Sequence, residues 1–117
     1  MFSGAHVVLY SQDAEADRAF FRDVLNFPAV DAGHGWLIFA MPPAEAAFHP
    51  ADKRQSLGAA LYLMCDDVKA TIEALKAKNV ACTKIEKERW GFLTTVPLPS
   101  GGKIGLYQPT HPTALKG

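Results

Sequence analysis

The chain has 117 residues, of which 49% are hydrophobic, and its twelve basic residues balance twelve acidic ones. This length and composition are typical of one globular domain, so we expect a single domain over residues 1–117. A net charge of zero gives no long-range attraction to phosphate backbones, which argues against a nucleic-acid partner. No hydrophobic run approaches the roughly 18 residues that cross a bilayer, so no membrane partner is expected either.

The cysteines and the amino terminus indicate a reducing compartment. Cys65 and Cys82 show no CxxC spacing and are too few for a disulfide framework. The first residues lack a basic region followed by a long apolar stretch, so they do not predict a secretory signal. We therefore expect a cytoplasmic protein in which both cysteines are small buried side chains.

The first half of the chain predicts a strand, a helix and three further strands. Alternating β-forming residues start the chain, and Asp13 can then cap a helix whose apolar residues recur at helical spacing. Asn26 tolerates the left-handed conformation that ends many helices, and Pro50 ends the last strand. The expected strands cover residues 5–10, 27–30, 36–40 and 45–49, and the helix runs from Asp13 to Leu25.

The second half repeats this order. Asp66 or Asp67 can cap its helix and Asn79 can end it, and the spacings from Asp13 to Asp66 and from Asn26 to Asn79 are both 53 residues. A common spacing of this kind is the signature of an internal duplication. The expected strands cover residues 59–65, 80–85, 90–96 and 103–108, and the helix runs from Asp67 to Lys78.

The repeat predicts an α+β fold of two βαβββ modules, at about residues 1–50 and 58–110, joined by a polar linker at 51–57. Consecutive strands with short turns favour a curved, mixed but mainly antiparallel sheet, with one helix per module on one face. The opposite face is too apolar for water. We expect it to form a cup-shaped pocket or to close on a second copy of the chain, as a homodimer.

Three stretches carry a resemblance to a known family: HVVLYSQDAEADRAFFRDVLNF, YLMCDDVKATIEALKAKNV and WGFLTTVPLPSGGKIGLYQP. The chain resembles the vicinal oxygen chelate superfamily, which includes glyoxalase I, the bleomycin and fosfomycin resistance proteins and extradiol dioxygenases. The resemblance implies paired βαβββ modules around a pocket, often in a homodimer. It also implies, for the enzymes, a divalent metal held by a histidine on the first strand and a glutamate on the last strand of each module, which would stabilise an enolate or alkoxide.

Several expected metal ligands are missing. His6 stands at the first-strand position of the first module, but Ala59 and Ala60 stand there in the second. Gly105 replaces the glutamate of the last strand.

In the first module, Ala46 is the counterpart of Gly105, and Glu45 is one residue away, which in a regular strand means the other face. A site from His6, Glu45 and His49 would need a strand bulge or ligands from a second chain. We therefore expect no cofactor. A divalent metal is possible only with His6 and Glu45 as weak candidates.

Aromatic residues on the inner face predict a small-molecule site instead. Trp36 and Trp90 occupy equivalent strand starts in the two modules, and apolar walls with a few polar groups are typical of ligand pockets. No Gly-x-Ser-x-Gly elbow or nucleotide-binding loop is present, so no catalytic residue is predicted. The expected ligand-binding residues are His6, Trp36, Phe48, Tyr62, Trp90 and Tyr107.

Three functions remain open at this point. The first is a metal-free protein that binds a small organic molecule. The second is an enzyme, a metal-dependent lyase or dioxygenase of the same superfamily with His6 as one ligand. The third is a structural dimer whose own side chains fill the cup.

Overall fold

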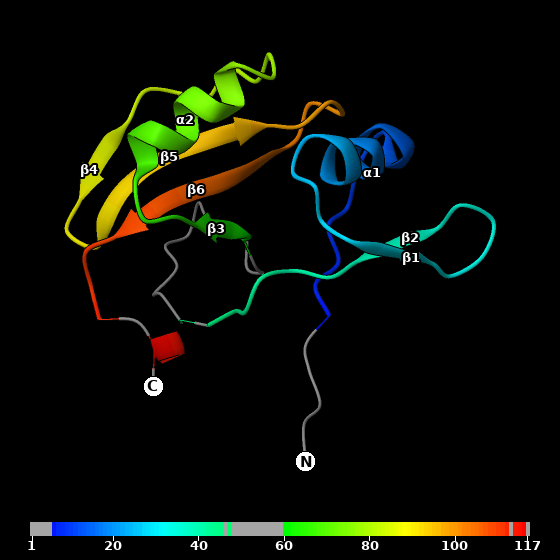
Figure 1. Ribbon diagram of the computed structural model, residues 1–117, viewed down its shortest axis with the longest axis horizontal. Coiled ribbons are helices and arrows are strands. Elements are labelled where there is room, and N and C mark those ends of the chain that lie inside the picture. The colour runs from blue at the N-terminus through cyan, green and yellow to red at the C-terminus, as the bar shows by residue number, and fades with distance from the viewer. Residues whose placement is uncertain (1–5, 46, 48–59, 113, 117) are drawn as a thin grey trace, which may run out of the picture.

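The computed structural model describes residues 6–45, 47, 60–112 and 114–116. Two helices, six strands and a short 3-10 helix follow one another in the described residues (Figure 1). In chain order these are α1 (Ala14–Asp23), β1 (Ala29–Asp31), β2 (Leu37–Phe39), β3 (Tyr62–Met64), α2 (Val68–Lys76), β4 (Glu86–Glu88), β5 (Gly91–Pro97), β6 (Lys103–Pro109) and the 3-10 helix η1 (Ala114–Lys116).

The second half of the chain forms a βαβββ unit. Its sheet has the order β3-β6-β5-β4, in which β3 runs parallel to β6 and the other neighbours are antiparallel. Helix α2 covers one face of this sheet, while η1 lies on the other side (Figure 1). The predicted α+β class with a mixed, mainly antiparallel sheet is confirmed.

Alternation along β6 separates a core face from an inner face. Ile104 and Leu106 are buried on the α2 side, whereas Gly105 and Tyr107 point to the other face. The buried apolar residues come from both helices, from the segment after α2 and from β5 and β6: Phe20, Phe21, Val68, Leu75, Val80, Val96, Ile104 and Leu106.

Both helices begin and end as their sequences predict. The side chains of Asp13 and Asp67 accept hydrogen bonds at 3.1 Å from the backbone N–H groups of Ala16 and Ala70. Asn26 and Asn79 adopt left-handed conformations with φ of 59° and 64°. The second cap is Asp67 rather than Asp66, so the two helix starts are one residue further apart than the duplication predicts.

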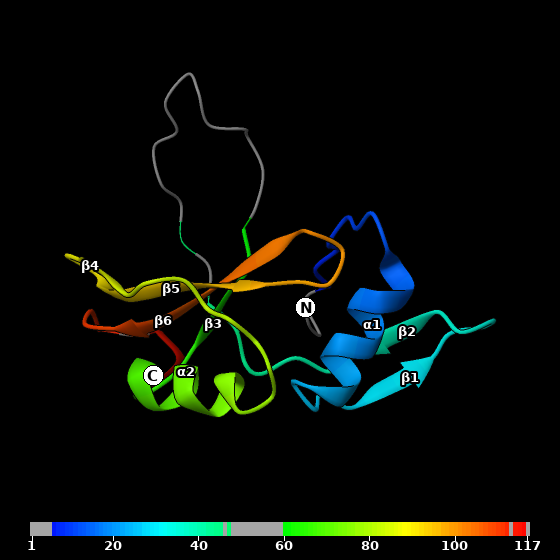
Figure 2. The same ribbon diagram turned by 90° about the horizontal axis from the view of Figure 1, so that it is seen from above.

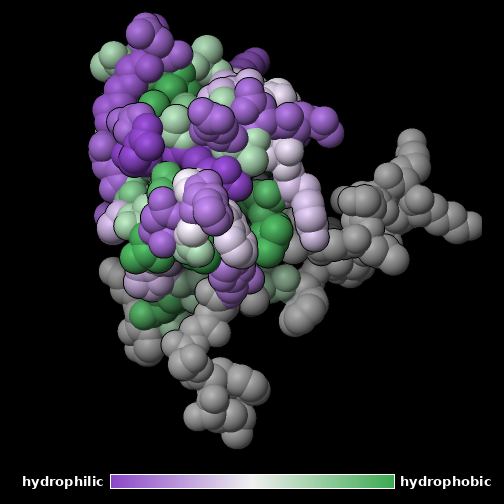
Figure 3. All heavy atoms as spheres, turned by 90° about the vertical axis from the view of Figure 1, so that its right-hand side faces the viewer, coloured by the Kyte–Doolittle hydropathy of each residue, from purple (hydrophilic) through white to green (hydrophobic). Residues whose placement is uncertain are grey.

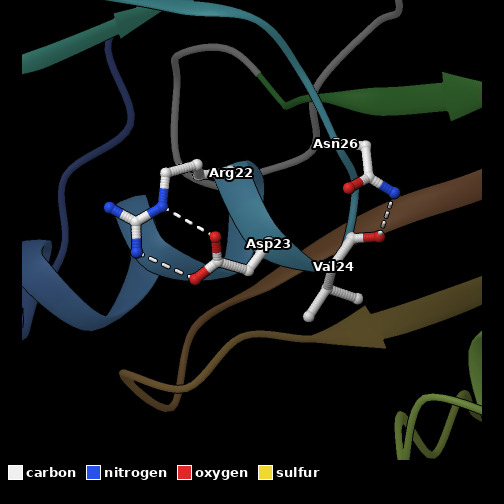
Figure 4. A network of polar contacts seen from close by, with 4 residues as sticks. All are labelled: Arg22, Asp23, Val24 and Asn26. Atoms are coloured by element: carbon white, nitrogen blue, oxygen red, sulfur yellow. Dashed lines mark hydrogen bonds and ion pairs between the residues drawn. The ribbon is translucent and has the colours of Figure 1, made fainter.

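The exposed end of α1 is tied together by polar contacts (Figure 4). Arg22 Nε lies 2.7 Å from Asp23 Oδ1, and Asn26 Nδ2 donates to the Val24 carbonyl at 3.4 Å. Because both members of the ion pair are exposed, it contributes little to stability.

Three hydrogen bonds hold α1 against the second half of the chain. The Asp17 carboxylate accepts hydrogen bonds from Ser100 N at 3.1 Å and Ser100 Oγ at 2.8 Å, in the turn between β5 and β6. Lys78, just beyond α2, donates to the Val24 carbonyl at 2.9 Å. The two halves therefore meet through their helices and through the β5–β6 turn.

The first half forms a less complete sheet than predicted. Strands β1 and β2 make a separate antiparallel hairpin beside α1 (Figure 2). The strand expected at 5–10 is not formed over His6–Tyr10, where Tyr10 is 97% exposed. A strand needs a neighbour for its N–H and C=O groups, and this segment has none within the described residues.

The prediction of a strand at 80–85 is also wrong, since β4 begins only at Glu86. Thr83 keeps one backbone bond to β5, from its N–H to the Thr95 carbonyl at 3.1 Å, and makes side-chain hydrogen bonds beside it. Its Oγ1 accepts from Thr95 N at 2.9 Å, and its carbonyl accepts from Thr94 Oγ1 at 2.6 Å. Threonine side chains compete with backbone pairing in this way, so the stretch is irregular although its composition favours a strand.

Two predicted segments, the linker at 51–57 and most of the strand at 45–49, lie outside the described residues. Within the described part, no helix is both long and apolar enough to cross a membrane. On the face that carries α1 and the hairpin, hydrophobic residues show as patches between hydrophilic ones (Figure 3).

Candidate functional site

Three aromatic rings meet on the inner face of the four-stranded sheet. Tyr62 comes from β3, Trp90 from the turn before β5, and Tyr107 from β6. Their ring centroids are 6.1 Å (Tyr62–Trp90), 5.8 Å (Tyr62–Tyr107) and 5.3 Å (Trp90–Tyr107) apart, and all three pairs pack edge to face. Edge-to-face contacts suit the charge distribution of aromatic rings and stabilise such a group.

A fourth ring, His111, stacks on Tyr107 with centroids 6.0 Å apart. Its Nδ1 lies 2.7 Å from the Pro112 carbonyl oxygen, which only accepts, so Nδ1 carries a proton and donates it. In the neutral ring Nε2 is then an acceptor, and the Tyr107 hydroxyl donates to it at 3.3 Å. We call Tyr62, Trp90, Tyr107 and His111 the aromatic cluster.

Glu45, distant in sequence, is bound by the segment that follows His111. Its Oε1 accepts a hydrogen bond at 2.9 Å from the backbone N–H of Ala114, which starts η1. Burial raises the pKa of Tyr107, and the nearby Glu45 carboxylate raises it further. The carboxylate is therefore close enough for its charge to act on the phenol.

An open hollow of about 340 Å³ adjoins the cluster. The hollow and the aromatic cluster share Tyr62, which lines the hollow and whose ring packs in the cluster. Leu9 and Leu93 supply apolar walls, and Thr95 and Lys103 supply polar groups. This is the mixture of groups found in small-molecule sites.

The structure brings three of the six predicted ligand-binding residues together, namely Tyr62, Trp90 and Tyr107. His6 is exposed, and Trp36 is 53% exposed at the start of β2, in the hairpin rather than in the cluster. Phe48 lies outside the described residues.

Sequence reasoning missed His111, which is not among the predicted ligand-binding residues. Hydrogen bonds beyond β6 place it: Thr110 N donates to the Trp90 carbonyl at 3.0 Å, and Thr110 Oγ1 to the Arg89 carbonyl at 3.1 Å. The chain thereby continues alongside the β4–β5 turn and returns His111 to Tyr107. The available signal was the spacing of four residues from Tyr107.

The residue in the place of the expected second-module glutamate does not fit a metal site. Tyr62 and Gly105 are direct neighbours on β3 and β6. A Cβ atom at position 105 would lie 2.6 Å from Tyr62 Cε1 and 2.9 Å from Tyr62 Cγ, closer than real side chains approach. The tyrosine ring occupies the space into which a ligand side chain would project.

The other candidate donors do not complete a site either. Glu45 is engaged by the N–H of Ala114, and Ala60 offers no donor. Among the described residues, no three histidine, cysteine, aspartate or glutamate side chains form a group that could hold a metal ion. The described residues do not fit the divalent metal that the resemblance implies for the enzymes.

The two thiols are poor nucleophile candidates. Both cysteines are free and half-buried, and burial raises the pKa of each thiol above its ordinary value. Cys65 also lies 3.6 Å from the Tyr107 carbonyl oxygen, to which its Sγ donates. The helix start beside Cys65 does not outweigh this burial, so the thiol stays protonated near neutral pH.

Comparison with models of known families identifies the superfamily of the chain. Residues 4–102 match the model of the Glyoxalase/Bleomycin resistance protein/Dioxygenase superfamily. The protein belongs to this superfamily, as the motifs and the βαβββ unit indicate. No curated protein sequence matches the chain.

Solved structures share its fold along most of its length. TnmS3, an antibiotic binding protein from Streptomyces sp. CB03234, is 26% identical, with 94% of this chain and 100% of that chain covered and a TM-score of 0.64. A glyoxalase/bleomycin resistance protein from the same organism is 27% identical over 84% of this chain and 93% of that one, with a TM-score of 0.56. Lactoylglutathione lyase from Agrobacterium tumefaciens has the same fold at 18% identity, covering 91% and 93% of the two chains, with a TM-score of 0.64.

Proposed function

We propose that this protein binds a small organic molecule at the aromatic cluster and the adjoining hollow, without a catalytic metal. The observation that carries the proposal is the packing of Tyr62 on Gly105, which puts an aromatic surface where the superfamily's enzymes are expected to present a carboxylate. The antibiotic-binding neighbour TnmS3 supports the same class of function.

The exposure of the rings supports a ligand rather than a sealed core. Tyr62 is 44% exposed and Trp90 is 37% exposed, although each packs against the others. Covering large exposed aromatic surfaces with a flat apolar molecule lowers the free energy, because this surface is removed from water. A metal-dependent lyase or dioxygenase would need several donors in one group, and the described residues supply no such group.

We also propose that the chain is a single domain that forms a homodimer in the cytoplasm. The apolar segment from Val7 to Tyr10 is exposed, and β3 has a neighbour on one side only within the described part of the sheet. Leu9 of this segment lines the hollow, so a partner that covers the segment also borders the ligand site.

A binding titration tests the proposed function. Quinoline, a flat two-ring molecule, is added to the protein while heat is measured by calorimetry. We expect saturable binding that weakens at least about tenfold in Trp90→Ala, since base-sized stacking partners contribute on the order of 1–3 kcal/mol. Trp36→Ala is the matched control and should bind as the wild type does. Equal loss in both variants, or no binding to the wild type, would contradict the proposal.

A further inference from the structure

Two polar groups at the aromatic cluster are left as hydrogen-bond acceptors, next to the possible donors of the Trp90 indole N–H and the Tyr62 hydroxyl. The Nδ1–H of His111 is used by the Pro112 carbonyl and the Tyr107 hydroxyl proton by His111 Nε2. The Tyr107 oxygen keeps a lone pair, and Glu45 keeps a second carboxylate oxygen beyond the one bound to Ala114 N. A ligand group that meets these two acceptors favourably donates hydrogen bonds or carries positive charge.

Among the side chains that the structure describes, no base forms an ion pair with Glu45. The ion pair found in the described part of the chain is the exposed Arg22–Asp23 pair. Lys103 lines the hollow but precedes Tyr107 by four residues on β6, which is about 13 Å along a strand. Half-buried and without a cationic partner among the described residues, Glu45 attracts a cation from outside the chain.

The rings add to this attraction. The face of an aromatic ring carries partial negative charge and holds a cation within about 6 Å of the ring centre, most strongly for tryptophan. Because the rings of Trp90 and Tyr107 are inclined by 78°, they present faces in two directions. Aromatic faces next to a carboxylate are how proteins bind amine and quaternary ammonium groups.

We propose that the ligand of the aromatic cluster is an aromatic cation, a flat ring system with a positively charged nitrogen, and that Glu45 selects this charge. The inference rests on the proposed function and names the ligand class for that same site. The flat part covers Tyr62 and Trp90, while the charged nitrogen lies toward Glu45 and the Tyr107 oxygen.

Three probes of one size and different charge test this class: 1-methylquinolinium, quinoline at pH 8, where it is uncharged, and 2-naphthoate. The protein carries Trp36→Phe, which leaves Trp90 as the only tryptophan. Binding is followed by the NMR signal of the Trp90 indole N–H. We expect 1-methylquinolinium to bind about fivefold more tightly than quinoline, with 2-naphthoate weakest.

Variants in which glutamine replaces a glutamate show whether the inference fails while the proposed function holds. Glu45→Gln should bring 1-methylquinolinium down to the affinity of quinoline without changing the latter. Glu73→Gln, an exposed glutamate on α2 across the sheet, should change neither. Equal binding of cation and neutral probe by the wild type, or a preference that survives in Glu45→Gln, overturns the aromatic-cation class and leaves the proposed function standing. Failure of all three probes overturns both.

Discussion

Tyr62 and Gly105 constrain each other across the β3–β6 pair. Gly105 has no left-handed φ, so the need for glycine there comes from the tyrosine ring and not from the backbone. A larger residue at 105 has to displace an aromatic ring that contacts both Trp90 and Tyr107. The pair therefore links the loss of a metal ligand to the presence of an aromatic surface.

Gly105→Ala should lower the free energy of unfolding by ~1–3 kcal/mol, because an added methyl group overpacks the contact with Tyr62. In a Tyr62→Ala background the same change should cost less than about 1 kcal/mol, since the ring is gone. Urea unfolding of the four proteins gives the coupling. Gly102→Ala is the control, because its added Cβ would meet Ser100 Oγ at an ordinary 3.4 Å. Equal costs in both backgrounds would show that Tyr62 does not impose the glycine.

The ionisation of Tyr107 offers a second prediction. Burial and the Glu45 carboxylate both raise the pKa of its phenol. The folded state thus holds this proton more tightly than the unfolded chain. The resulting stability is fully present below about pH 10, the pKa of an unfolded tyrosine, and is lost as the pH rises through the folded pKa.

Glu45→Gln should lower the pKa of Tyr107 relative to the wild type, although burial keeps it above its ordinary value. The ring carbon bonded to the Tyr107 hydroxyl reports the titration by NMR. An unchanged pKa in Glu45→Gln would place the carboxylate too far from Tyr107 to select a ligand charge.

Among the elements, those with local signals were predicted and those that depend on distant partners were not. The aspartate caps and the asparagine residues predicted the bounds of α1 and α2 to within two residues, because both signals act locally at the ends of a helix. Alternation placed Tyr62 and Tyr107 on the inner face. The segment His6–Tyr10 has the composition of a strand but no neighbour among the described residues, and composition alone does not show this.

The site shows the same division. The equivalence of Trp36 and Trp90 in the repeat predicted that both would reach one pocket, but β1 and β2 form a separate sheet. His111 reaches Tyr107, and Glu45 reaches the Ala114 N–H, through the folding of segments that no periodicity reveals.

Thr83 offers a prediction for the irregular stretch before β4. Thr83→Val removes the acceptor of the Thr95 N–H and should lower the free energy of unfolding by about 0.5–1.5 kcal/mol. Thr83→Ser keeps the hydroxyl and should cost less than half as much. Chemical unfolding of the two variants compares them directly. Similar costs would mean that the methyl group, rather than the hydrogen bond, holds this stretch to β5.

In the whole molecule, the first and second halves have different roles. The second half carries the complete βαβββ unit and most of the aromatic cluster, and the first half adds α1, the hairpin and Glu45. Contacts between Asp17 and Ser100 join the halves on the side of the helices. The two halves are thus unequal in structure, although their sequences predict the same order of elements.

The most direct test of the account is a titration of the Trp36→Phe protein with 1-methylquinolinium, followed at the Trp90 indole N–H, with a strong chelator and then with added Ni²⁺ or Mn²⁺. We predict saturable binding that is the same with chelator and with metal, and that is lost in Tyr62→Ala, because aromatic rings rather than metal donors form the site. Binding that requires the added metal and disappears in His6→Ala would contradict the account.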